Sequence, residues 1–155
     1  MSELFLAKAI DLAVENIHRG NGGPFAAIVV KDGAIIATGV NSVTTLNDPT
    51  AHAEVMAIRA ACQALNSFEL TGCDLYTSCE PCPMCLGAIY WARPAHVYFA
   101  ATSSDAAGAG FDDSYIYQQA ALPHDKRSIP MTHVTGVDGA RPFIEWAGLA
   151  NKTPY

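Results

Sequence analysis

Two short segments of this 155-residue sequence carry the side chains best suited to bind a metal ion and to move protons. His52 and Glu54 stand two residues apart in the first segment, and Cys82 and Cys85 stand three residues apart in the second. An imidazole and two thiolates are ligands that zinc prefers, and a nearby carboxylate can carry protons. Each segment alone is a weak signal, whereas the two together predict a zinc centre with a proton shuttle.

Three protein ligands leave the fourth position of a zinc ion open for water, which is typical of catalytic sites. Zinc lowers the pKa of a bound water to about 7, so that hydroxide is available at neutral pH. Glu54, which is not one of the expected ligands, is then free to take the proton of the water and pass it to a substrate. The alternative is a closed structural site with a fourth ligand from Cys79, Cys73 or His96.

The first segment is expected at the start of a helix over residues 49–65. Asp48 is a typical N-cap, and Pro49 stands in the first turn, where a helix tolerates proline. In a helix interior, residues two apart point about 200° away from each other. His52 and Glu54 therefore converge on one metal ion only near a helix start, which this prediction provides.

The second segment is expected at the start of another helix, over residues 83–92. Pro83 suits its first position, and Cys82 and Cys85 then lie on one side. Two helix N-termini would face the metal, and their partial positive charge favours thiolates and an anionic hydroxide.

The pattern of apolar residues predicts the remaining elements. A period of 3.6 predicts a helix over residues 3–19, and Asp32-Gly33 between two apolar segments predicts a hairpin turn. Further expected elements are strands over 25–31, 34–41, 73–78, 95–101 and 131–136, and helices over 112–121 and 142–150, with loops over 42–48 and 102–111. Helices alternating with strands after an opening helix and hairpin indicate an α/β fold of three layers, α/β/α, around a mixed central sheet.

The composition favours a single cytoplasmic domain that acts on small molecules. Half of the residues are apolar. The sequence has nine Lys and Arg and fifteen Asp and Glu, which gives a net charge of −6. Nucleic-acid binding usually needs a basic surface, so no nucleic-acid partner is expected. The sequence has neither a membrane-spanning apolar run nor a signal-peptide pattern, so no membrane partner is expected either. Five cysteines indicate metal binding in a reducing compartment rather than disulfides.

The segments NDPTAHAEVMAIR (47–59) and TSCEPCPMCLGAIYWARP (77–94) resemble the cytidine deaminase superfamily. The second of them, together with FDDS (111–114) and the closing ANKTPY (150–155), resembles bacterial guanine deaminases within that superfamily. The resemblance covers essentially the whole chain. It implies a cytidine deaminase-like fold, one Zn²⁺ per subunit, and hydrolytic deamination of guanine to xanthine and ammonia by a zinc-activated water, a step of purine metabolism.

The resemblance also assigns residues to roles. It implies His52, Cys82 and Cys85 as zinc ligands, Glu54 as the proton shuttle, and Asp113 as a carboxylate that binds the purine and assists proton transfer. The remaining residues that match the base-binding site of the family are Asn41, the backbone of Ala53, the aromatic residues Phe25, Trp91 and Phe111, and Tyr155. It further implies a homodimer in which a C-terminal segment, about residues 140–155, is exchanged between subunits, so that Tyr155 acts in the partner's site.

The chemistry of the base favours guanine independently. Guanine presents N–H donors at N1 and at its 2-amino group, which suit an acceptor-only carboxylate such as Asp113. Adenine and cytosine present bare ring nitrogens, which an ionised carboxylate would repel. By residue type alone Asp113 also suits a helix start and Asn41 a turn, while the aromatic residues also suit the core and chain ends usually fray.

Other functions share the same zinc motif. A tRNA adenosine deaminase would carry it too, but such an enzyme needs basic surface, and residues 140–155 contain only Arg141 and Lys152 as cations. Deamination of cytosine, a nucleoside or a triazine also fits, because pocket shape decides the substrate. A reading of a different class is a structural zinc-binding module without activity, in which Glu54 has no role.

Overall fold

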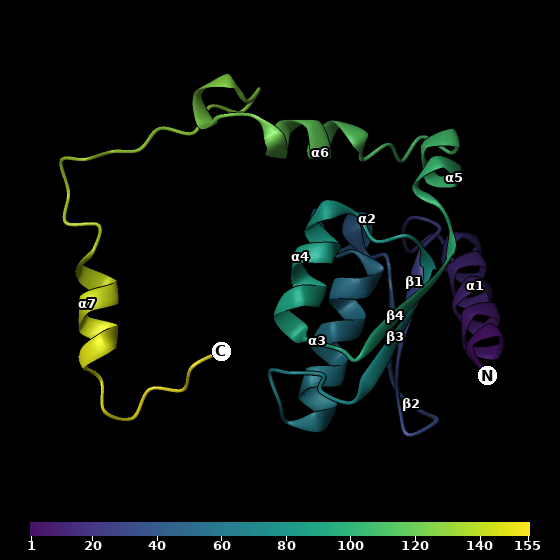
Figure 1. Cartoon of the computed structure of the whole chain (residues 1–155). Coiled ribbons are helices and arrows are strands. Elements are labelled where there is room, and N and C mark those ends of the chain that lie inside the picture. Colours follow the sequence, from purple (N-terminus) through teal and green to yellow (C-terminus); the bar gives the residue numbers. More distant parts are fainter. The chain divides into compact units, whose positions relative to one another are not determined.

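Four strands form one mixed sheet in the computed structural model, which describes residues 1–155 (Figure 1). The strands are β1 (Ala26–Lys31), β2 (Ala34–Val40), β3 (Cys73–Cys79) and β4 (His96–Ala101), in the order β2-β1-β3-β4. Strand β1 is antiparallel to both neighbours, and β3 is parallel to β4. Positive φ angles of 51° at Asp32 and 79° at Gly33 form the tight turn of the β1–β2 hairpin.

Alternation of side chains along β1 builds the two faces of the sheet. Ala27 and Val29 belong to a buried cluster with α3 (Ala53–Leu65) and α4 (Pro83–Ala92). Ile28 and Val30 point to the other face and pack against α1 (Ser2–His18). Helices therefore cover both faces (Figure 1), and the expected three-layer α/β/α fold is confirmed. None of the helices is long and apolar enough to span a membrane.

The backbone of β2 lies directly against α3 at Gly39. A Cβ atom at Gly39 would lie 2.3 Å from the carbonyl oxygen of Ala53 and 2.3 Å from the amide nitrogen of Ala57. Because both atoms belong to the helix backbone, neither can move without displacing α3. Glycine at this position thus permits the close packing of the helix whose first turn holds Glu54.

Gly39→Ala is expected to lower the free energy of unfolding by about 1–3 kcal/mol, the usual cost of overpacking. Urea unfolding of the wild type and the variant measures this difference. Gly108→Ala is the matched control, since a Cβ atom there meets nothing within 4 Å. Equal unfolding midpoints for Gly39→Ala and Gly108→Ala would contradict the close packing.

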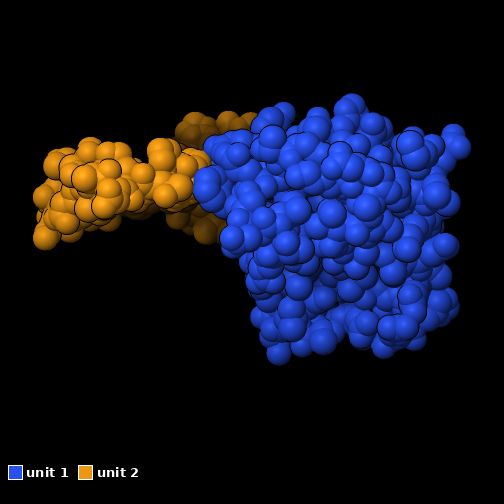
Figure 2. Space-filling view, turned by 90° about the horizontal axis from the view of Figure 1, so that it is seen from below, with its two compact units in different colours: residues 1–113 blue, residues 114–155 orange.

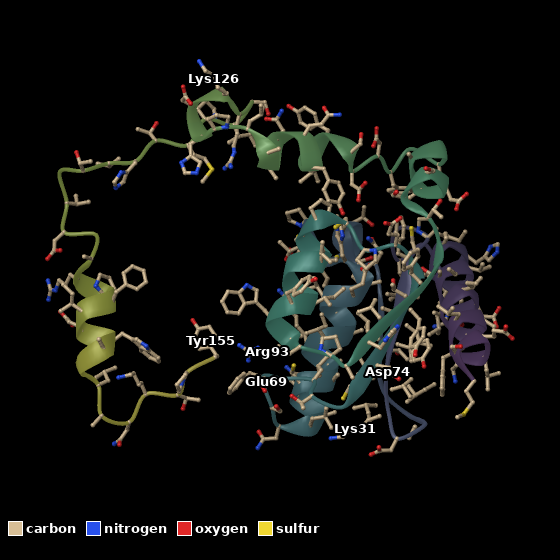
Figure 3. All side chains as sticks on the ribbon, viewed as in Figure 1. Lys31, Glu69, Asp74, Arg93, Lys126 and Tyr155 are labelled. Carbon is tan, nitrogen blue, oxygen red and sulfur yellow. The ribbon has the colours of Figure 1, made fainter.

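The end of α4 is fixed by contacts with the segment that precedes β3. Arg93 ends the helix in the left-handed conformation, with φ 55°, and its guanidinium pairs with Glu69 (Figure 3). The amide of Leu70 donates to the carbonyl of Ala92 at 2.7 Å. These contacts join the end of α4 to the segment just before β3.

Two short helices lie where loops were expected. Helix α2 (Val43–Leu46) lies within residues 42–48, and α5 (Ser103–Gly108) lies within residues 102–111. Thr102 starts α5 with a capping box, in which its side chain accepts from the Asp105 amide and the Asp105 carboxylate accepts from the Thr102 amide. This reciprocal pair stabilises a helix too short for apolar periodicity to indicate.

The chain divides into two compact units, residues 1–113 and residues 114–155, which Figure 2 colours blue and orange. The second unit contains α6 (Ser114–Ala121), a 3₁₀ turn (His124–Lys126) and α7 (Arg141–Gly148). The strand expected over residues 131–136 is wrong, because no strand in the structure pairs with this segment and a strand needs such a partner. A single deaminase domain over residues 1–155 stays a prediction.

Candidate active site

The expected site residues of the first unit gather at one edge of the sheet, with the exception of Trp91, which lies in the last turn of α4, next to the segment that precedes β3. The strand register brings the start of β1 and the ends of the other three strands together at this edge. The pairs that show this are Ala26 with Val40, Ala27 with Thr77, and Cys79 with Ala101. Open α/β sheets bind ligands outside the carboxyl ends of their strands. The segments that follow β2, β3 and β4, and the one that precedes β1, therefore meet at a single place.

Helix α3 begins at Ala53, with His52 as its extended N-cap, so the expected start near residue 49 is wrong. Asp48 instead closes a local turn, in which its Oδ1 accepts from the amide and the hydroxyl of Thr50 at 2.8 and 2.7 Å. This turn competes with helix capping for the same carboxylate. As a result His52 and Glu54 lie in the cap and first turn, where their side chains can converge.

Helix α4 begins as expected, with Cys82 as N-cap, Pro83 in the first position and Cys85 in the first turn. His52 Nδ1 lies 3.5 Å from the Sγ atom of Cys82 and 3.5 Å from that of Cys85. Ordinary Zn–N and Zn–S bonds in a tetrahedral centre place nitrogen and sulfur ligands about 3.6 Å apart. The spacing and the chemistry of these three side chains thus fit a zinc ion.

The cluster of possible metal ligands consists of His52, Cys82 and Cys85 alone, with all ligand atoms within 4.8 Å of one another. The side chains considered for a fourth ligand, those of Cys79, Cys73 and His96, do not belong to it. The thiol of Cys79 instead donates to the carbonyl of Thr102 at 3.7 Å. Three ligands are the number that leaves one coordination position open.

Hydrogen bonding shifts the pKa values of the two cluster thiols in opposite directions. A hydrogen bond from Cys85, and after it one from His52, lowers the pKa of Cys82 to about 4. The same contact and burial raise the pKa of Cys85 well above its usual range. Cys82 is thus the more acidic of the two thiols, and a bound metal ion would favour the thiolate form of both.

Glu54 is buried beside the ligand cluster, with 6% of its surface exposed. Its Oε1 accepts from the Thr77 hydroxyl at 3.3 Å, and its Oε2 accepts from the Cys85 thiol at 3.4 Å. Burial is the main cause that raises the pKa of this carboxyl. A carboxyl with a raised pKa, held next to a metal site, is suited to carry a proton in both directions.

Asn41 follows β2 and is nearly buried, with 8% of its surface exposed. Its Oδ1 accepts from the amides of Gly23 at 3.1 Å and Val43 at 3.4 Å. The side-chain Nδ2 is thereby left as the group that can meet a ligand. Ala53, whose backbone was also expected to contact the base, is fully buried at the start of α3.

Two of the three expected aromatic residues are in contact. The rings of Phe25, before β1, and Phe111, after α5, pack edge to face with centroids 5.0 Å apart. Trp91 lies on α4 with 64% of its surface exposed. Tyr155 ends the second unit, 73% exposed, and its role stays a prediction.

Asp113 directly precedes α6, which begins at Ser114 and not at the expected residue 112. Partial burial raises the pKa of its carboxyl, and the negative charge of Cys82 raises it further. The effect of Cys82 means that the carboxyl lies within electrostatic reach of the ligand cluster. The structure thus brings the FDDS segment to the same edge of the sheet.

Two residues near the cluster were not expected from the sequence. Thr77 holds the Glu54 carboxyl, and Glu80 accepts from the Ser103 amide at 2.9 Å, which ties the end of β3 to the start of α5. Thr77 stands in a continuously buried strand, where a polar residue needs a partner, and this is a signal that sequence analysis can use. For Glu80, the only signal in the sequence is its position next to the cysteine motif.

Comparisons with known proteins agree with this geometry. Residues 1–101 match the model of the cytidine and deoxycytidylate deaminase zinc-binding region. The guanine deaminase of Bacillus subtilis is 59% identical over 153 residues, which are 99% of this chain and 98% of that protein. The X-ray structure of guanine deaminase from the same organism covers the same shares of both chains with a TM-score of 0.97.

Similarity to two further proteins is less extensive. A tRNA-specific adenosine deaminase of Aquifex aeolicus is 46% identical over 99 residues, 64% of this chain and 65% of that protein. A crystal structure of a protein variant in complex with 8-azaguanine matches at 36% identity with a TM-score of 0.70, covering 73% of this chain and 65% of the other. The family model, the fold and the His–Cys–Cys cluster all lead to one assignment. This chain belongs to the zinc-binding cytidine and deoxycytidylate deaminase family.

Proposed function

We propose that the protein is a zinc-dependent guanine deaminase, an aminohydrolase that converts guanine and water to xanthine and ammonia. The observation that carries the proposal is the three-ligand cluster of His52, Cys82 and Cys85 with the buried carboxyl of Glu54 beside it. Similarity along nearly the whole chain to a guanine deaminase supports the choice of base. The tRNA-specific relative matches only part of the chain, and the net charge of −6 also disfavours an RNA substrate.

In the proposed mechanism His52, Cys82 and Cys85 hold one zinc ion per subunit. The zinc ion, when bound, polarises the attacking water and lowers its pKa. Glu54 accepts the first proton of the attacking water and delivers it to a ring nitrogen. It then accepts the proton of the hydroxyl newly bound to the ring carbon and delivers it to the departing amino group, which leaves as ammonia. The Thr77 hydroxyl keeps the Glu54 carboxyl in place through these transfers.

The base is held by the groups at the same edge of the sheet. The Asp113 carboxylate accepts from the N–H donors of guanine and assists proton transfer. Asn41 and the Ala53 backbone provide further hydrogen bonds, and the aromatic rings of Phe25 and Phe111, which contact each other, pack against the purine. Trp91, in the last turn of α4, is proposed as a third aromatic wall. A similar protein forms a complex with 8-azaguanine, which supports a purine as the ligand.

Ammonia release measured over a panel of substrates tests the proposed function. The panel contains guanine, adenine, cytosine, their nucleosides, the triazine ammeline, and tRNA. We expect release from guanine at a rate far above that from the others. Ammonia from tRNA or cytosine without ammonia from guanine would contradict the proposal, and no release from any substrate would favour a structural zinc module.

Asp113→Ala is expected to lower kcat/KM for guanine by about 10²-fold, because a charged acceptor for two donors is lost. Zinc content, measured by metal analysis, should stay at the wild-type level, since Asp113 is outside the ligand cluster. Asp112→Asn serves as the control, because it removes the neighbouring charge and leaves Asp113 in place. If both variants turn over guanine equally well, Asp113 does not bind the base.

We further propose a homodimer in which the C-terminal segment of one subunit closes the site of its partner. None of the residues 114–155 is buried, so this unit has no core of its own. It exposes many large apolar side chains, among them Ile129, Met131, Val134, Val137, Phe143, Ile144, Trp146 and Leu149. Exposed apolar surface of this extent usually belongs to an interface, and a second copy of the chain is the proposed partner.

Deleting residues 151–155 is expected to lower kcat/KM for guanine by about 10²-fold through loss of Tyr155 and of site closure. Zinc content should not change, because none of the deleted residues belongs to the ligand cluster. Mixing the shortened protein with full-length Glu54→Gln then tests exchange. A rate above the sum of the two separate proteins means that an intact tail completes the partner's site, and a rate equal to the sum contradicts exchange.

We propose the cytoplasm as the place of this reaction. All five cysteines are free thiols, and two of them belong to the metal cluster. Thiols persist in a reducing compartment. Neither a membrane nor a nucleic acid is needed as a partner in the proposed reaction, whose substrate is a free purine base.

A further inference from the structure

A buried asparagine on α1 contacts the loop and the strand end that hold two of the proposed base-binding residues. Asn16 is 2% exposed, and its Nδ2 donates to the carbonyls of Gly23 and Asn41, at 2.9 Å each. Both hydrogens of the Asn16 amide are therefore used. Helix α1 lies on one face of the sheet, so this side chain connects that face to the edge where the site lies.

The side chain of Asn41 is held in one orientation by its surroundings. Its Oδ1 accepts from the amides of Gly23 and Val43, so the oxygen points back to the chain. The loop also approaches closely, since a Cβ atom at Gly22 would lie 2.2 Å from the Asn41 carbonyl oxygen. With its oxygen occupied, the Asn41 amide can offer a base only a hydrogen-bond donor.

Phe25 is joined to the same contacts. The Gly23 carbonyl that accepts from Asn16 also accepts from the Phe25 amide, at 2.9 Å. The Phe25 carbonyl in turn accepts from the Asn41 amide at 3.0 Å. Asn16 thus contacts the backbone of Asn41 directly, and that of Phe25 through the Gly23 carbonyl to which both donate.

Asn16 does more than fill space under the loop. Its Oδ1 is buried and makes no hydrogen bond with the chain. A buried polar atom without a partner is unfavourable, and an apolar side chain of similar size would avoid this cost. The two hydrogen bonds that Nδ2 donates are what an apolar residue could not supply.

We propose that Asn16 is a positioning residue that fixes the Asn41 side chain as a donor, so that the site selects bases with an acceptor at this point. Guanine has such acceptors at O6 and N7. The inference rests on the proposed function, because it concerns how that same site recognises its base. Asn16 itself does not touch the substrate in this proposal and acts through Asn41 and Phe25.

A double-mutant cycle on the full-length, zinc-loaded protein tests the inference, with KM and kcat for guanine as readouts. Asn16→Ala is expected to raise KM by roughly 10-fold with a smaller change in kcat, the effect of one misplaced hydrogen bond. In an Asn41→Ala background the same change should have little further effect. A helix residue that only supports the fold would instead add its effect in both backgrounds.

A matched control separates positioning from stability. Ala13→Gly destabilises the same helix at a buried position, and an alanine side chain cannot hydrogen-bond to Asn41 or Gly23, so KM should stay unchanged while Tm falls. Gly22→Ala places a methyl group against the Asn41 carbonyl, which also accepts from Asn16. Its KM is measured in the wild-type and Asn41→Ala backgrounds, so the inference is tested even if Asn16→Ala does not fold.

Three outcomes are distinct. An unchanged KM in Asn16→Ala or, if that variant does not fold, in Gly22→Ala overturns the inference, and so do effects that add fully to Asn41→Ala. Rescue supports it when Asn16→Ser, which keeps a donor, has a KM between those of the wild type and Asn16→Ala. A wild-type protein that releases no ammonia from guanine contradicts the proposed function itself, before any variant is compared.

Discussion

Replacing Glu54 with Gln is expected to lower guanine turnover by about 10²–10⁴-fold, the usual contribution of a positioned proton carrier. Glutamine has the same shape and can still accept from the Thr77 hydroxyl, so the fold and the ligand cluster should persist. Single-turnover and steady-state rates of ammonia release measure the loss. Metal analysis of the same sample should show zinc at the wild-type level.

The control for this variant is Glu3→Gln, which removes a carboxylate from the first turn of α1, away from the site. It should retain the full rate. If Glu54→Gln kept a rate near that of the wild type, another group would have to move the protons. If Glu54→Gln lost its zinc instead, Glu54 would have to be a zinc ligand. That result would contradict the cluster of three ligands, to which Glu54 does not belong.

Removal of zinc is expected to abolish activity, by about 10³-fold or more, because the attacking water then keeps its high pKa. Dialysis against a strong chelator followed by addition of Zn²⁺ measures the loss and its recovery. Cys85→Ser should lose both zinc and turnover, since Cys85 belongs to the ligand cluster. Cys62→Ser is the matched control, because Cys62 lies outside that cluster and should keep both.

The outcomes of zinc removal also separate an enzyme from a structural module. A protein that unfolds on chelation, and that consumes no purine when zinc is restored, would be a zinc-stabilised binding module. A chelated protein that retains its rate would show that no metal takes part. The open arrangement of three ligands beside a buried carboxyl favours neither of these results.

The short-range features of the site are the part that sequence could predict. The spacing of Cys82 and Cys85 around Pro83 defines a helix start by itself, and α4 begins where this pattern indicates. The short apolar run before Lys31 likewise indicates β1, and the Asp32-Gly33 turn indicates the hairpin. Such signals depend on neighbours within a few residues, which the sequence displays directly.

Local alternatives that compete for the same group were not predicted. Asp48 was expected to cap α3, yet its carboxylate closes a turn with Thr50, and the helix begins at Ala53. Both uses of the carboxylate satisfy backbone N–H donors, so the residue type does not distinguish between them. The strand expected over residues 131–136 had the right side-chain pattern but no neighbouring strand to pair with.

By itself, the sequence determined the chemical groups of this protein: an imidazole, two thiols and a carboxyl at spacings that suit helix starts. Only the tertiary structure decided that Thr77 donates to Glu54, that Phe25 contacts Phe111, and that Asn16 donates to the Asn41 carbonyl. The reason is physical. Ligand spacing is a property of a few consecutive residues, whereas these contacts join residues 23 or more positions apart whose meeting depends on strand order and register.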